Sequence, residues 1–286
     1  MAAAIAASVV HGVHIVRRHI RASLLTFSAV ALLSTVGIAP VAARTTDAND
    51  TLHVALRSAE TGFDPQAADD TYSYEVCAAI FDAPYKYDYF ARPLRLVPNT
   101  ASDLPEITDQ GRTYTIHIKP GIYFADDPVF EGHKRELTAA DYVFSYKRIL
   151  DPRLRSSFLY IFENRLLGLG PMLAKARKDG RLNYDTPIEG LQVLDRYTFR
   201  VRFIDPDYGF QYWLTTVPFA AVAQEVVKAH EDASDRVMEH PVGTGPYRLA
   251  QWRRSQRIVL DANPNFRDER YPAPPRDSPE DALIAK

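Results

Sequence analysis

The stretch LTAADYVFSYKRILDP, Leu137–Pro152, contains both ends of a helix and its apolar pattern. Thr138 is a typical N-cap residue, and Asp141 follows three residues later, which is the spacing of a capping box. Apolar residues then recur at helical spacing until proline forbids continuation after Asp151: Tyr142, Val143, Tyr146, Ile149 and Leu150. The stretch therefore predicts a helix over Ala139–Leu150, about three turns long and packed on one side.

A second stretch, HPVGTGPYRLAQW at His240–Trp252, predicts a tight backbone approach followed by a strand. Gly243 and Gly245 flank Thr244, and glycine is the residue that permits such an approach. The residues from Tyr247 to Trp252 then alternate as in a strand. Pro246 would block the helix that a dinucleotide-binding glycine loop must open, so this is not such a loop.

In combination, these stretches resemble the large extracytoplasmic solute-binding proteins of ABC importers, the oligopeptide/dipeptide-binding family (family 5). Further blocks match that family in order: Thr51–Gln66, with a first strand before a turn at Phe63-Asp64-Pro65; Gly111–Asp127; a strand pair at Asp195–Phe203; and Trp252–Phe266. The chain departs from the family pattern at Asp126-Asp127-Pro128, where Asp-Gly is usual, and in the insertion VFEGHKRE.

The resemblance implies an α/β fold of the periplasmic-binding-protein type (class II, large type). It implies a discontinuous first lobe (lobe I) at 45–81 and 225–268, an inserted domain at 82–224, and a polar, proline-rich tail at 269–286. By the same resemblance, the second lobe, which closes over the ligand, is expected to be missing from these 286 residues. Helices are expected near Ser73–Phe81, Ala139–Leu150, Pro171–Lys178 and Glu225–His230, and strands at Tyr114–Ile118, Tyr197–Phe203 and Ile258–Asp261.

The same resemblance implies three groups of ligand-facing residues. They are the first-lobe loop Asp69, Asp70, Thr71 and Tyr72; a cleft aromatic, Phe158, with Tyr160 close by; and the loop at the base of the cleft, Gly243, Thr244 and Gly245. A structural role is the alternative for each group, because the aromatics could belong to a core and the glycines could only make a turn. The absent lobe would supply the anchor for the ligand's amino terminus, so no equivalent residue is assigned.

The N-terminus predicts export. Arg17, Arg18 and Arg21 precede an uncharged apolar run, and Val41-Ala42-Ala43 offers the small residues of a cleavage site, so residues 1–43 are expected to be a signal peptide. An uncleaved membrane anchor is the rival interpretation, since the run just reaches spanning length. No cysteine follows the run closely enough for a lipoprotein, so the product is expected to be soluble in the periplasm.

Residues with reactive side chains do not assemble into a catalytic pattern. Cys77 lies among apolar neighbours in an expected helix, which predicts a buried, inert thiol. The eight histidines are scattered, and His53 and His117 fall in expected strands. The adjacent pairs Asp69-Asp70 and Asp126-Asp127 suit an adventitious cation better than acid–base catalysis. We therefore expect no enzyme activity, no cofactor and no dedicated metal site.

Composition excludes one class of partner. With 34 basic and 36 acidic residues, the chain lacks the excess of positive charge that nucleic-acid binding requires.

The resemblance implies ABC-transporter permease subunits and a peptide or similar small solute as partners, and a monomer if the protein is complete. The rivals are a non-functional fragment, a split-gene product that needs a partner chain, and a secreted hydrolase.

Overall fold

The computed structural model describes residues 51–234 and 236–269, so the expected signal peptide and nearly all of the expected tail lie outside the described residues. Among the described residues, those from Val54 onward belong to one compact unit. The helices are α2 (Thr71–Ile80), α3 (Ala139–Leu150), α4 (Leu169–Asp179), α5 (Phe210–Trp213) and α6 (Gln224–His230), with 3₁₀ turns η2 (Asp109–Gly111), η3 (Pro128–Phe130), η4 (Leu159–Ile161) and η5 (Val217–Phe219). The strands are β1 (Tyr85–Tyr87), β2 (Leu96–Pro98), β3 (Glu106–Thr108), β4 (Thr113–His117), β5 (Leu191–Asp195), β6 (Thr198–Arg202), β7 (Tyr247–Arg253) and β8 (Arg257–Ala262).

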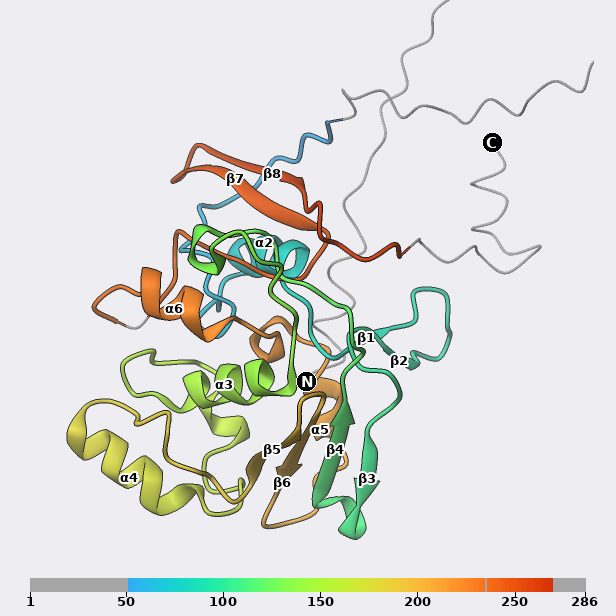
Figure 1. Ribbon diagram of the computed structural model, residues 1–286, viewed down its shortest axis with the longest axis vertical. Helices are drawn as coiled ribbons and strands as arrows, with labels where there is room; N and C mark the ends of the chain where they lie inside the picture. Colours follow the sequence, from blue (N-terminus) through green and yellow to red (C-terminus); the bar gives the residue numbers. More distant parts are fainter. Residues whose placement is uncertain (1–50, 235, 270–286) are drawn as a thin grey trace, which may run out of the picture. The chain divides into compact units, whose positions relative to one another are not determined.

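The largest sheet has the order β3-β4-β6-β5, with every neighbouring pair antiparallel (Figure 1). The register pairs Tyr114 with Val201 and Ile116 with Phe199, so alternate residues of β4 and β6 share one buried face. On that face the rings of Phe199 and Tyr142 of α3 are stacked with centroids 5.4 Å apart. The sheet is thus covered by the helix that the capping box predicts.

Most of the expected elements form. Helix α3 has the predicted bounds, and the backbone N–H of Thr138 donates to the Asp141 carboxylate at 2.8 Å. The expected strand at the start of the chain is wrong, because residues 51–70 contain no strand and His53 is therefore not in one. A strand needs hydrogen bonds from a neighbour, and within the described residues no strand pairs with this segment.

Helix α3 is also more deeply buried than its apolar pattern predicts. In addition to the residues of its apolar face, the helix fully buries two polar residues, Ser145 and Arg148, and Arg148 lies on the side away from that face. The Arg148 guanidinium donates to both carboxylate oxygens of Asp64, at 2.6 and 3.0 Å, and to Gln66 at 2.6 Å. The prediction that α3 packs on one side only is wrong. The ion pair with Asp64 compensates the charge of Arg148, so this side of the helix can also be buried.

The buried apolar residues form two clusters. The main cluster lies between the β3-β4-β6-β5 sheet and α3 and extends to α4, and the second surrounds α2 and includes Phe63, Cys77, Val217 and Val227. The β7–β8 hairpin packs on α2 and completes the second cluster with Leu249, Trp252, Ile258 and Leu260 (Figure 1). Cys77 is fully buried, as the sequence predicts, and burial raises the pKa of its thiol well above the ordinary value, which disfavours the reactive thiolate.

Candidate functional site

The first predicted group, Asp69 to Tyr72, lies at the N-terminal end of α2. Asp70 is the N-cap, and its carboxylate accepts from the backbone N–H groups of Tyr72 at 3.1 Å and Ser73 at 2.8 Å. The Thr61 hydroxyl also donates to it at 2.6 Å. Burial raises the pKa of the Asp70 carboxyl, but the hydrogen bonds from Ser73 and Thr61 outweigh burial and hold the pKa below its ordinary value. Asp70 therefore has a structural role as a helix cap.

The neighbouring Asp69 is exposed and connects the first predicted group to the second. Its carboxylate accepts from the Ser157 hydroxyl at 3.1 Å, and the Ser156 hydroxyl donates to the Gln66 carbonyl at 2.7 Å. These bonds hold the loop before α2 against the loop that carries Phe158. The first two predicted groups, which are far apart in sequence, are therefore adjacent in space.

The two predicted aromatics differ in exposure. Phe158 is partly buried and packs on the main cluster, whereas Tyr160 is 56% exposed. The ring of Tyr160 meets Trp213 edge-on, with centroids 6.0 Å apart. The sequence pattern did not single out Trp213, because nothing in its local surroundings relates it to a segment some fifty positions earlier.

The third predicted group, Gly243 to Gly245, packs against the C-terminal end of α2. The Gly245 N–H donates to the Ile80 carbonyl at 2.8 Å, and a Cβ built on Gly243 would lie 2.1 Å from that same oxygen. Both glycines and Thr244 are buried. Helix α2 has ten residues and is therefore about 15 Å long, so this group lies at the other end of the helix from Asp69. The structure does not bring the third group together with the first two.

A polar cluster that sequence reasoning missed surrounds Thr244. Its hydroxyl donates to the Asp82 carboxylate at 3.0 Å, and Arg267 donates to the same carboxylate at 2.7 Å and to the Asn99 side chain at 2.7 Å. Burial lowers the pKa of the Arg267 guanidinium, but Asp82 outweighs it and raises the pKa. These residues are far apart in the chain, and only their tertiary contacts show that Thr244 is held from within the protein.

The arrangement leaves one exposed combination of predicted site residues. Asp69 and Thr71 are exposed, Asp69 contacts the loop of Phe158 and Tyr160 through Ser157, and Tyr160 is itself exposed. Across residues 51–234 and 236–269, none of the helices combines the length and the apolar character needed to cross a bilayer.

Comparison with known proteins identifies the family. Residues 95–276 match the model of the bacterial extracellular solute-binding proteins, family 5, middle region, and the chain belongs to this family. The chain is 28% identical over 248 residues to the peptide transport periplasmic protein SapA of Salmonella typhimurium, covering 82% of this chain and 40% of SapA. It is 25% identical over 230 residues to the di/tripeptide-binding protein 2 of Pseudomonas aeruginosa, covering 76% of this chain and 38% of that protein.

Solved structures share the fold. A periplasmic binding protein, DppA, from Helicobacter pylori in complex with the peptide STSA matches with a TM-score of 0.56 and 24% identity, covering 72% of this chain and 38% of that chain. OppA of Burkholderia pseudomallei matches with a TM-score of 0.58 and 18% identity, covering 74% of this chain and 38% of that chain. The fold is therefore part of an α/β periplasmic-binding-protein fold, and the chain spans about 40% of the length of the curated relatives it matches.

Proposed function

We propose that this chain belongs to the solute-binding component of an ABC importer that takes up peptides or similar small solutes. The family membership of residues 95–276 carries the proposal. Relatives named as a peptide transport periplasmic protein and a di/tripeptide-binding protein support the solute class. The role requires export to the periplasm and delivery of the solute to permease subunits in the inner membrane, without enzymatic conversion.

The ligand-facing surface in this proposal is the N-terminal end of α2 together with the loop that bears Tyr160. The hydrogen bond between Asp69 and Ser157 supports it, because it brings the two segments together while both residues stay exposed. An exposed carboxylate suits a peptide ammonium or amide N–H, and an exposed ring suits an apolar side chain. The loop Gly243–Gly245 takes no direct part, since its backbone is used in packing on Ile80.

The two apolar clusters support a division of this chain into lobe I and an inserted domain. The second cluster draws on residues from Phe63 to Phe81 and from Val217 onward, which corresponds to a discontinuous lobe I. The main cluster draws mostly on residues between Tyr85 and Phe219, which corresponds to the inserted domain. On this proposal the boundary lies at or just after η5, where residues of the two clusters alternate along the chain, a few residues earlier than the expected position 225.

Ligand-observed NMR with a mixture of di- to tetrapeptides tests the proposed surface. A surface that covers a ligand from one side buries little of it, so the 286-residue chain is expected to bind no tighter than about 1 mM, or about 4 kcal/mol. Saturation transfer to the peptides should fall in Asp69→Asn and in Tyr160→Ala. Tyr208→Ala is the matched control. Tyr208, in the loop that follows β6, is 61% exposed, as Tyr160 is exposed, but its ring packs beside Gly111 and it does not belong to the proposed surface.

Two results would contradict the proposal. One is the absence of saturation transfer from the wild-type chain to any peptide at millimolar concentration. The other is an equal loss of transfer in Tyr208→Ala and in the two site variants, which would mean that the peptides contact the surface at random.

A further inference from the structure

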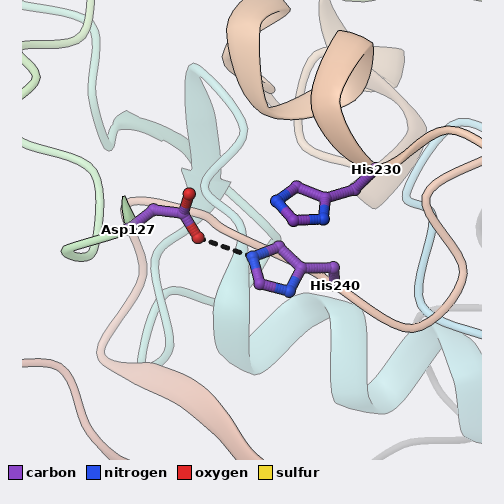
Figure 2. Close-up of side chains that lie close together, drawn as sticks. All are labelled: Asp127, His230 and His240. Carbon is purple, nitrogen blue, oxygen red and sulfur yellow. Dashed lines mark hydrogen bonds and ion pairs between the residues drawn. The ribbon is translucent and has the colours of Figure 1, made fainter. Parts of the chain in front are cut away.

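Three side chains that could bind a metal ion lie together beside the loop leading to Gly243. Asp127 precedes η3, His230 is the last residue of α6, and His240 opens the stretch HPVGTGPY (Figure 2). One potential ligand atom from each residue lies within 4.8 Å of the other two. The scatter of histidines along the chain hides this grouping, because α6 and the loop after it fold back on each other.

The two imidazole rings are closely paired. Their centroids are 3.7 Å apart and their planes differ by 18°, and Figure 2 shows both rings beside the Asp127 carboxylate. A neutral imidazole offers its nitrogen lone pair in the plane of the ring, so the two stacked rings have to turn about their side-chain bonds to direct one nitrogen each at a shared ion. The ligand atoms of the three residues are close enough for such a small rearrangement to bring them together.

The carboxylate is oriented by its own surroundings. Asp127 Oδ1 accepts from the backbone N–H of Val129 at 3.0 Å, which caps η3, and Oδ2 lies 2.5 Å from Nε2 of His240. The Asp127 side chain is only 3% exposed, whereas that of His240 is 40% exposed. One oxygen is thus occupied by the cap, and the other is directed to the imidazoles at an accessible edge. Such orientation by a surrounding hydrogen bond is common at metal ligands.

We propose that Asp127, His230 and His240 form a binding site for a divalent transition metal ion, with Zn²⁺ as the best-fitting ion. Two imidazole nitrogens and one carboxylate oxygen form a donor set that suits zinc, whereas calcium and magnesium prefer oxygen ligands alone. Three protein ligands leave a position for water in a tetrahedral site. A bound ion would connect η3, the end of α6 and the loop that leads to Gly243.

Calorimetric titration of the tag-free 286-residue chain with ZnCl₂ tests the site, with MgCl₂ and CaCl₂ as comparisons. One equivalent of Zn²⁺ should bind, with no comparable binding of Mg²⁺ or Ca²⁺. Loss of an outer-shell partner typically costs 10–100-fold in metal affinity, so His230→Ala, His240→Ala and Asp127→Asn should each weaken zinc binding by at least about tenfold. At a free zinc concentration of about 100 times Kd, Tm should rise by about 5–10 °C.

His133→Ala is the matched control, because His133 lies in the exposed loop just after η3 and does not belong to the cluster. It should bind zinc with unchanged affinity. His230→Ala is the decisive variant, because His230 is exposed and its replacement should leave Tm in EDTA unchanged even where His240→Ala lowers it. The proposal is overturned if the wild-type chain binds no zinc up to 1 mM, or if His230→Ala retains full affinity, or if His133→Ala loses as much affinity as the three site variants.

Discussion

The segments at the two ends of helix α2 are both predicted from the sequence to contact the ligand, but their surroundings in the structure differ. At the C-terminal end, Gly243 and Gly245 are buried and their backbone lies against the carbonyl of Ile80. At the N-terminal end, Asp70 caps the helix while the adjacent Asp69 remains exposed beside Ser157. The family resemblance predicts ligand contact for both segments.

The comparison of the two ends of α2 shows that packing alone can explain why a motif such as Gly243-Thr244-Gly245 is present. Gly243 and Gly245 are required because their backbone lies too close to the backbone of Ile80 for a side chain to fit. A Cβ at Gly243 would collide with the Ile80 carbonyl. The hydrogen bonds to Thr61 and Ser73 likewise explain Asp70. Packing does not explain an exposed carboxylate at Asp69 or an exposed ring at Tyr160, so these positions are the better candidates for ligand contact.

The largest effect is expected at the buried end of the helix. Gly243→Ala should lower the free energy of unfolding by about 3 kcal/mol or more, because the new Cβ would meet backbone atoms that cannot move aside. Urea denaturation followed by circular dichroism measures the change. Gly170→Ala is the control: Gly170 lies in α4 with open space around it, and the substitution should be neutral or stabilise by up to about 1 kcal/mol. Equal stability of Gly243→Ala and wild type would remove the contrast between the two ends.

A smaller effect is expected at the helix cap. Asp70→Ala should cost about 1 kcal/mol at pH 7, whereas Asp70→Asn, which keeps a capping oxygen, should cost less. Because the folded pKa of Asp70 lies below its ordinary value of 3.8, the ionised cap stabilises the fold above that pH, and this contribution disappears as pH falls through the folded pKa. Urea melts at pH 7 and pH 3 should therefore bring wild type and Asp70→Asn closer together in acid. A difference between them that grows in acid would contradict the assignment.

The smallest effect on stability is expected at Asp69. Its hydrogen bond to Ser157 is exposed, so Asp69→Ala and the matched variant Ser157→Ala should each change the free energy of unfolding by less than about 0.5 kcal/mol. Thermal melts of both variants beside wild type measure the change. If Asp69→Ala lost more than about 1 kcal/mol, Asp69 would be a structural residue like Asp70, and neither end of α2 would stand out for ligand contact.

The local elements could be predicted because their signals are contained in short stretches. Thr138, Asp141 and Pro152 define both ends of α3 through capping and the missing proline N–H, and the structure has the same bounds. The alternation after Tyr247 likewise predicted β7. The strand expected near Thr51 did not form, because a strand depends on a partner that its own residues cannot specify.

The sequence by itself determined the order of the elements, the family and the buried state of Cys77, since motif order and local apolar pattern carry this information. Only the tertiary structure decided which predicted site residues meet: it placed Asp69 beside Ser157, packed Gly243 on Ile80, and brought Asp127, His230 and His240 together. The physical reason is that hydrogen bonds and close packing between distant segments depend on how the chain is folded in three dimensions, which spacing along the chain does not encode.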